Sequence, residues 1–170
     1  MPSDLTTLEP ESGAPFVGAM DDVYSKPGHL IRRLQQIAVA AFAQECADQA
    51  MTPVQYAALV AVRDNPGLDA TRIASLIAFD RSTLGSVLER LETKGLIERR
   101  AKADDRRVKI LKISRRGLRL LDESEPSVRR AQERMLDPLT EQERSNLLGL
   151  MRRIIERHDA QQRGGHHDVI

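Results

Sequence analysis

The sequence predicts a mainly α-helical chain with one small β-hairpin, arranged as a winged helix-turn-helix with further helices at both ends. Three observations lead to this fold class. An amphipathic helix begins at Arg81, a hairpin rich in β-branched residues follows it, and two short capped helices precede it. Helix, helix, turn, helix and hairpin is the order of elements in a winged helix-turn-helix.

The helix that begins at Arg81 has clear signals at both ends. Asp80 stands where an N-cap is expected, and Gly95 stands where a left-handed residue ends a helix, so that Leu96 can pack back on the last turn. One stripe is apolar and must face a core: Leu84, Val87, Leu88 and Leu91. Hydroxyls and arginines occupy the free face: Arg81, Ser82, Thr83 at its margin, Ser86 and Arg90. Such side chains can reach bases and phosphates in a major groove, although an ordinary solvated face would look the same.

The hairpin that follows favours nucleic-acid binding over an ordinary solvated face. Two runs rich in β-branched residues, 97–100 and 108–113, enclose a polar turn that carries Arg106 and Arg107 near its tip, as a wing does. The apolar phase changes between Ile110 and Leu111, which suggests a bulge or a twist. Residues 81–116 contain twelve Lys and Arg against five Asp and Glu, a net charge of +7 in a chain whose total is +1. Charge and shape together predict DNA binding.

Two shorter helices complete the lobe. Thr52, Pro53 and Gln55 form the signature of a capping box, and Asp69 can cap the next helix. The first helix has an apolar stripe made of Val54, Ala57, Ala58, Ala61 and Val62. The second has Ile73, Leu76 and Ile77.

The remaining helices lie at the two ends of the chain. One is predicted from about Pro27 to Ala47, a long one from near Ser114 with a kink at Pro126, and a last one opened by a capping box at Thr140. The last helix has an apolar stripe made of Leu147, Leu150, Met151, Ile154 and Ile155. The middle of the chain alone can form a winged helix. The extra helices must therefore bury their apolar faces against each other, and a second copy of the chain is the simplest further partner. A monomer with a larger helical core is the alternative.

These elements divide the chain. We assign 49–113 to a DNA-binding lobe, 24–48 and 114–160 to dimerisation helices, 1–23 to a flexible acidic arm and 161–170 to a flexible tail.

Composition excludes several other classes of protein. No apolar run is long enough for a membrane span, and the first 25 residues hold five acids and no Lys or Arg, unlike a secretory signal, so we expect a cytoplasmic protein without a membrane partner. Only five Phe and Tyr and no Trp are present, which favours duplex DNA over single strands or RNA. No nucleotide-binding, zinc-protease or hydrolase motif occurs, so no enzyme, cofactor or metal site is expected.

The motifs resemble those of the MarR family of bacterial transcriptional regulators over residues 30–155. The most specific stretches are 80–84, 88–97, 105–107 and 113–117. The resemblance implies an obligate homodimer on operator DNA, commonly released by a small phenolic or aromatic acid. It places Arg81, Ser82, Thr83, Ser86 and Arg90 in the major groove, and Arg107, supported by Asp105, in the minor groove beside Arg106. The run 29–36 resembles the branch that represses aromatic-acid and nicotinate catabolism.

For a carboxylate effector we predict three binding residues: His29 and Arg33, one helical turn apart, and Tyr56. Each has a plainer reading, since Tyr56 can be a core residue and Arg33 can pair with an acid of a second subunit. Two other functions stay open. One is a redox-sensing repressor that uses Cys46, the only cysteine, whose acidic neighbours would raise its pKa. The other is a winged helix that docks only to protein.

Overall fold

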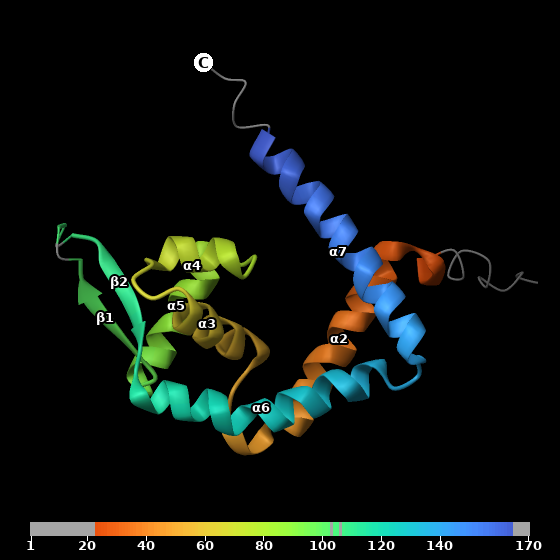
Figure 1. Ribbon diagram of the computed structural model, residues 1–170, viewed down its shortest axis with the longest axis horizontal. Coiled ribbons are helices and arrows are strands. Elements are labelled where there is room, and N and C mark those ends of the chain that lie inside the picture. Colours follow the sequence, from red (N-terminus) through yellow and green to blue (C-terminus); the bar gives the residue numbers. More distant parts are fainter. Residues whose placement is uncertain (1–22, 103, 106, 165–170) are drawn as a thin grey trace, which may run out of the picture. The chain divides into compact units, whose positions relative to one another are not determined.

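The structure is a computed structural model that describes residues 23–102, 104–105 and 107–164. Two compact units, Met1–Gln36 and Ile37–Ile170, make up the chain. The acidic arm, Arg106 and the end of the tail lie outside the described residues. Figure 1 shows a mainly helical chain with a single two-stranded hairpin, which confirms the predicted fold class.

The lobe consists of α3 (Pro53–Asp64), α4 (Ala70–Leu76), α5 (Arg81–Thr93), β1 (Ile97–Ala101) and β2 (Lys109–Ile113). All three N-caps predicted for the lobe are confirmed. The side chain of Thr52 accepts from the backbone N–H of Gln55 in a complete capping box, with Pro53 in the first turn. Asp69 and Asp80 accept from the third residue of their helices in the same way.

The end of α5 also has the predicted form. Gly95 is left-handed with φ +68°. Its N–H donates to the carbonyl of Glu92 at 2.8 Å, and the N–H of Leu96 donates to the carbonyl of Leu91 at 2.9 Å. These two bonds are a Schellman motif, in which Leu91 and Leu96 are both buried. Helix α5 therefore has a fixed end.

The hairpin is regular, and the predicted bulge is absent. Five consecutive antiparallel pairs run from Ile97–Ile113 to Ala101–Lys109. Both edges of β2 are paired: beyond β1, the Leu111 N–H donates to the Leu68 carbonyl at 2.9 Å, and Asp69 bridges to Ile110. Ile110 is half-buried and Leu111, on the opposite face, is buried, so apolar residues lie on both faces of β2 without a change of register.

One core holds the lobe together, and α3 contributes most to it. Helix α3 contacts α4, α5, β2 and α6, and its buried side chains include Leu59 and the amide side chain of Gln55, which the predicted stripe omitted. On α4 the buried pair is Ile73 and Ala74, whereas Leu76 is 55% exposed, so the predicted α4 stripe was wrong at that position. The stripe of α5 was right: Leu84, Leu88 and Leu91 are fully buried.

Helix α6 (Arg115–Leu136) leaves the hairpin through a close contact. Ser114 caps it and donates its hydroxyl to the Gly95 carbonyl at 2.7 Å. A Cβ at Gly117 would overlap the carbonyl oxygen of Leu96 and would lie 2.8 Å from Cγ1 of Ile113, so only glycine fits there. The helix continues through Pro126. Its buried face contains Leu121, Val128 and Ala131, whereas Leu118 is exposed.

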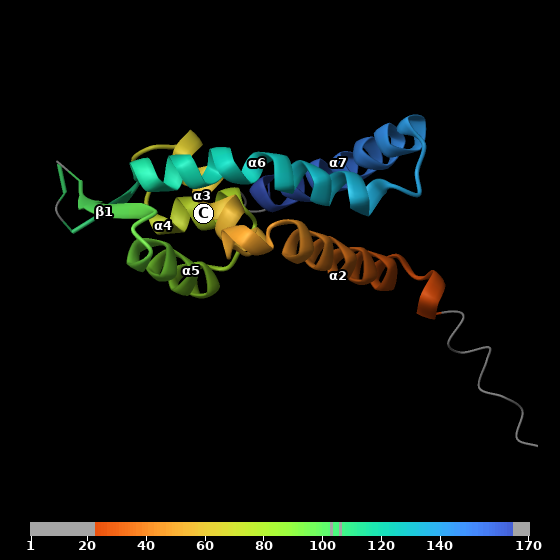
Figure 2. The same cartoon turned by 90° about the horizontal axis from the view of Figure 1, so that it is seen from below.

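The outer helices are α2 (Pro27–Glu45), followed by the 3₁₀-helix η1 (Ala47–Gln49), and α7 (Glu141–Gly164), which is visible from a second side in Figure 2. Phe42 and Cys46 pack on Val128 and Ala131 of α6. Arg130 and Arg134 of α6 pair with Glu45 at 3.0 and 3.3 Å. By contrast, large apolar side chains of α2 and α7 are exposed: Leu30, Ile31, Leu34, Ile37, Val39, Leu148, Leu150, Met151, Ile154 and Ile155. None of the helices described is long and apolar enough to cross a membrane.

Candidate nucleic-acid interface

The outer face of α5 is polar along its whole length. The five residues predicted to face a major groove are all exposed: Arg81, Ser82, Thr83, Ser86 and Arg90. They lie opposite the buried leucine stripe, so packing of that stripe fixes their direction. Helix α5 thus presents a row of hydroxyls and cations that no core contact requires.

Asp80 orders the beginning of this face. Its carboxylate accepts from the Ser82 hydroxyl at 2.6 Å and from the Thr83 N–H at 2.8 Å. Because these donors stabilise the charged form, first Ser82 and then Thr83, the pKa of Asp80 lies far below its ordinary value. Ser86 donates its own hydroxyl to the Thr83 carbonyl at 2.9 Å. Both serine hydroxyls therefore present lone pairs outward, which suits amino groups on base edges.

The wing carries Arg107 into solvent. The Asp105 carboxylate accepts from the Arg107 backbone N–H at 3.0 Å, and the same oxygen lies 3.8 Å from the guanidinium Nε. The Arg107 side chain is 97% exposed. The contact with Asp105 therefore orders the turn and leaves the guanidinium accessible to solvent. The predicted partnership of Asp105 and Arg107 is present as geometry; its role on DNA stays a prediction.

A hollow of about 370 Å³ separates the wing from the helix-turn-helix, and cations from both line it. Arg81 comes from the start of α5, Arg107 from the wing and Lys109 from β2, while Thr71 of α4 and Asp69 complete the polar lining. Arg81 and Arg107 were predicted separately from the sequence, whereas Lys109 and Thr71 were not predicted. The charge count over 81–116 already included Lys109, but only the strand pairing places it beside Arg81.

The predicted effector residues fall in different units. His29 is half-buried on α2, with its ring centroid 5.2 Å from that of Tyr24, and the Arg33 guanidinium donates to the Gln36 side chain at 2.9 Å. Both belong to the unit Met1–Gln36, whereas Tyr56 belongs to the unit Ile37–Ile170. An effector site made of the three residues stays a prediction.

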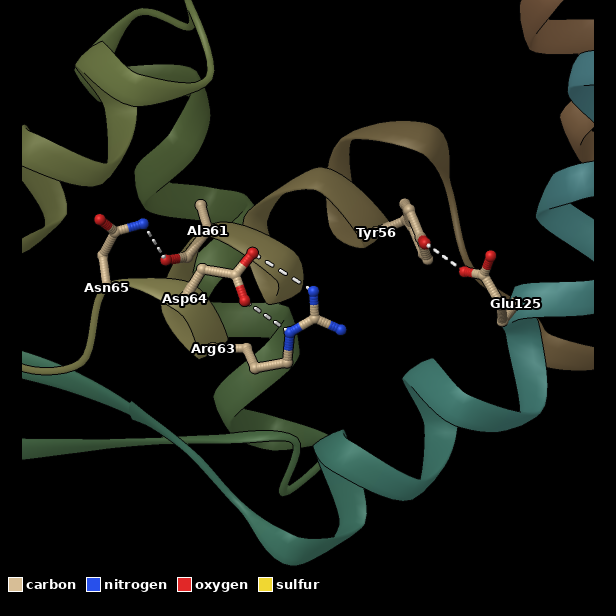
Figure 3. A network of polar contacts seen from close by, with 6 residues as sticks. All are labelled: Tyr56, Ala61, Arg63, Asp64, Asn65 and Glu125. Carbon is tan, nitrogen blue, oxygen red and sulfur yellow. Dashed lines mark hydrogen bonds and ion pairs between the residues drawn. The ribbon is translucent and has the colours of Figure 1, made fainter.

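Tyr56 has a partner that the sequence analysis missed. Figure 3 shows its hydroxyl directed at Glu125 of α6, to which it donates at 3.3 Å. Burial raises the pKa of Tyr56, and the Glu125 charge raises it further, so the phenol stays protonated. Its ring also lies 6.0 Å from that of Phe42. Tyr56 thus links α3 to α6 and the end of α2, and a carboxylate ligand would have to compete with Glu125 for its proton.

Cys46 is poorly placed for redox sensing. Its side chain is 1% exposed within the small cluster with Phe42 and Val128. Burial raises the pKa of the thiol, and the negative charge of Glu45 adds to this, as the acidic neighbourhood predicted. Because the thiolate is the reactive form, both effects suppress its chemistry.

A capped helix with a polar outer face, beside a hairpin with an exposed arginine, defines a winged helix-turn-helix DNA-binding protein. A profile of the MarR family matches residues 51–109. The HTH-type transcriptional repressor NicR of Pseudomonas putida is 31% identical over 145 residues, which cover 85% of this chain and 92% of NicR. The chain belongs to the MarR family and is a DNA-binding transcriptional regulator.

Solved structures agree with this assignment. The structure of Bordetella bronchiseptica BpsR, described as regulated in DNA binding by 6-hydroxynicotinic acid, matches with a TM-score of 0.73 and 28% identity over 77% of this chain and 94% of that chain. The repressor CouR bound to a 23-mer DNA duplex matches with a TM-score of 0.74 and 26% identity over 84% of this chain and 99% of that chain. These relatives are regulators rather than enzymes, in line with the sequence analysis.

Proposed function

We propose that this regulator is a homodimeric repressor that binds a palindromic operator through α5 and the wing, and that a small aromatic acid releases it. The observation that carries the DNA-binding geometry is the hollow between Arg81 and Arg107. A helix in the major groove and a wing arginine in the adjacent minor groove are separated by one stretch of sugar-phosphate backbone. Cations lining the space between them suit that backbone.

The homodimer rests on the outer helices. The apolar stripe of α7 is exposed over two helical turns, with Leu150 at 52% and Ile154 at 59%. An apolar stripe of this length on a soluble chain is costly unless it is covered. A second copy supplies a matching stripe by symmetry, and two recognition helices then meet half-sites about one turn of DNA apart.

The effector class rests on the relatives and on cations in α2. The DNA binding of the relative BpsR is regulated by 6-hydroxynicotinic acid, and a cation beside an apolar wall is what a carboxylate with an aromatic ring requires. We propose that Arg33 is the anchor, with His29 one turn before it and Tyr56 as a further polar partner.

Operator binding is tested first. Fluorescence anisotropy with duplexes from the upstream region of the regulator's own gene should show tight binding that weakens steeply with salt. Sedimentation of the complex should show two chains on each duplex. Binding that depends on neither salt nor sequence would overturn the DNA-binding geometry and favour a lobe that docks to protein.

Release is tested with the complex. Titration with 6-hydroxynicotinate and salicylate should lower operator affinity about 5- to 150-fold, the usual size of allosteric coupling. Arg33→Ala should lose most of this response, whereas Arg32→Ala, its neighbour on the same helix, should keep it. Equal release of all three proteins would show that Arg33 is not the anchor.

A repressor that senses oxidants through Cys46 is the second candidate, and its burial argues against it. Peroxide should leave operator affinity unchanged in both the wild type and Cys46→Ser. Release of the wild type alone would establish the redox mechanism instead.

A further inference from the structure

The outer face of α5 has a central row of side chains that present hydrogen-bond acceptors to solvent. The members of this acceptor row stand at i, i+4, i+7 and i+11 and are all exposed: Ser82, Ser86, Glu89 and Thr93. At about 100° per residue they fall within an arc of about 60°. The buried stripe repeats the spacing of the first three members two residues later, at Leu84, Leu88 and Leu91. Two residues are about 200° of rotation, so packing of the stripe directs the acceptor row away from the core.

The hydroxyl protons of the row are already engaged within α5 and its N-cap. The Ser82 hydroxyl donates to the carboxylate of Asp80 at 2.6 Å. The hydroxyls of Ser86 and Thr93 donate to backbone carbonyls three and four residues earlier, each at 2.9 Å. Because a hydroxyl has one proton and two lone pairs, each of these oxygens is left with acceptor capacity alone.

Glu89 adds a carboxylate to the row, and an ionised carboxylate is also acceptor-only. It was not among the residues predicted from the sequence. The other acid of α5, Glu92, pairs with Arg99 at 3.1 Å, whereas Glu89 has no ion pair within the described part of the chain. An unpaired carboxylate on a face that binds DNA is repelled by phosphate, so its position is favourable only where the operator offers it a donor.

Arginines flank the acceptor row on both sides. Arg81 stands one residue before Ser82 and Arg90 one residue after Glu89, which places them about 100° from these neighbours in opposite directions. Both arginines are exposed. The sugar-phosphate backbones of both strands border a major groove, so this arrangement places acceptors over base edges and cations towards the two backbones.

The major groove offers donors on only two bases. Adenine presents its N6 amino group beside the N7 acceptor, and cytosine presents its N4 amino group without an adjacent acceptor, whereas guanine and thymine present acceptors. Hydroxyl acceptors therefore fit either amino group, and a carboxylate fits cytosine, because N7 of adenine would repel it. From Ser82 to Glu89 the row is about 10 Å long, which is about three base-pair steps.

We propose that the acceptor row selects operators by their amino groups: each half-site carries adenine or cytosine opposite Ser82 and Ser86, and cytosine opposite Glu89. This assignment rests on the proposed function, because it requires α5 in the major groove. Glu89 is then a specificity-determining residue, and the flanking arginines supply affinity that depends little on sequence.

The base opposite Glu89 is tested by selecting duplexes from a randomised pool with full-length wild type, Glu89→Gln and Glu92→Gln. The wild type should select half-sites with an invariant cytosine, and Glu89→Gln should lose it and favour adenine, because a glutamine amide bonds N6 and N7 of adenine. Glu92→Gln removes the same charge from the same helix, about a quarter-turn from the row, and should select the wild-type sequence.

Two outcomes of this selection contradict the assignment in different ways. Identical half-sites from the wild type and Glu89→Gln, or the same change in Glu92→Gln, would overturn the role of Glu89 and leave the proposed function standing. A wild type that selects no sequence would overturn both.

The selected operator then measures discrimination by fluorescence anisotropy. Replacing the invariant C·G pair by T·A should lower the affinity of the wild type at least about tenfold, the size of one good base contact, and that of Glu89→Gln less than about twofold. Removal of a carboxylate that is only solvated would instead strengthen binding to both duplexes equally, because repulsion from phosphate is lost. Equal strengthening would overturn the assignment.

The hydroxyl acceptors are tested with methylated bases. N6-methyladenine or N4-methylcytosine, placed at each adenine and cytosine of the half-site in turn, exchanges the groove-facing N–H for a methyl group. At one position the wild type should lose at least about tenfold in affinity, whereas Ser86→Ala, which binds the unmodified operator more weakly, should show little further loss. The same modified base outside the half-sites should have no effect. If Ser86→Ala and methylation are additive at every position, Ser86 accepts from no base and the acceptor row does not read amino groups.

Discussion

The DNA-binding lobe and the outer helices differ in the exposure of their apolar side chains. In the lobe, Leu59, Ile73, Leu84, Leu88 and Leu111 are at most 1% exposed, and every predicted cap is satisfied within the lobe. On α7, side chains of the same kind are about half exposed. The lobe closes its own core, whereas α7 leaves its apolar stripe exposed.

The lobe and the outer helices should therefore be stabilised in different ways. The lobe should unfold as one unit, with a midpoint that does not depend on protein concentration. The outer helices should gain their order from association, so their unfolding should depend on protein concentration.

The largest effect is expected at Gly117, where the lobe joins α6. Gly117→Ala forces a methyl group against the Leu96 backbone, which cannot move without breaking the Schellman end of α5. We expect a loss of about 3 kcal/mol or more in the free energy of unfolding, at the upper end for overpacked sites.

Gly85 provides the matched control for that change. It lies within α5 with open space around its Cα, so Gly85→Ala should raise the unfolding free energy by about 0.5–1 kcal/mol through helix propensity. Urea unfolding followed by circular dichroism compares the two. Similar midpoints for both variants would show that the close approach at Gly117 does not constrain the fold.

The second effect is expected on the outer helices. Ile154→Asp places a charge within the exposed stripe of α7, and burial of that charge should raise the dimer dissociation constant at least about a hundredfold. Sedimentation measures this change. The lobe should unfold at an unchanged urea concentration, because its core includes no side chain of α7.

Ser145→Asp is the control, since it adds the same charge on the opposite side of α7. It should leave the dimer intact. If Ile154→Asp lowers the unfolding midpoint of the lobe as much as it weakens the dimer, the lobe and the outer helices share one core and the comparison fails.

Caps and helix ends could be predicted from the sequence because each depends on a few neighbouring residues. Thr52, Asp69, Asp80 and Gly95 all have the predicted geometry. The errors fall where a distant segment decides the outcome. The second edge of β2 is paired with 67–69 and its register is regular, and Leu76 is exposed at the end of a seven-residue helix.

In the candidate site, too, the features that depend on neighbouring residues could be predicted, and those that depend on distant segments could not. The exposed face of α5 follows from one helical stripe, so its five residues were accessible to sequence reasoning. Lys109 lines the hollow with Arg81 through strand pairing, and Glu125 meets Tyr56 across 69 residues of chain. No spacing in the sequence encodes such meetings.

The third effect concerns function and should leave both kinds of stability unchanged. Arg107→Ala removes an exposed guanidinium that no core contact needs. Operator affinity should fall about tenfold or more, and the slope of log affinity against log salt should decrease by about one. Arg100→Ala on the same wing is the control, because the Arg100 guanidinium already pairs with Glu98 at 2.7 Å. Equal losses of operator affinity for both variants would show that the wing contributes only diffuse positive charge and that Arg107 makes no specific contact.

The smallest effect compares two helix ends within the lobe. Helices α4 and α5 end in the same pattern: the Ala78 N–H donates to the Ser75 carbonyl at 3.4 Å and the Phe79 N–H to the Ala74 carbonyl at 3.0 Å, as the N–H groups of Gly95 and Leu96 do one helix later. Yet the left-handed residue is Ala78, with φ +54°, where α5 has Gly95.

A left-handed residue with a Cβ costs about 1 kcal/mol, part of which the greater freedom of glycine in the unfolded chain offsets. Ala78→Gly should therefore stabilise the lobe by about 0.5 kcal/mol, a rise of about 2–4 °C in its melting temperature, with dimerisation unchanged. Gly95→Ala should shift the melting temperature of the lobe in the opposite direction. A lower melting temperature for Ala78→Gly would mean that the Ala78 methyl group contributes more by packing than its backbone conformation costs.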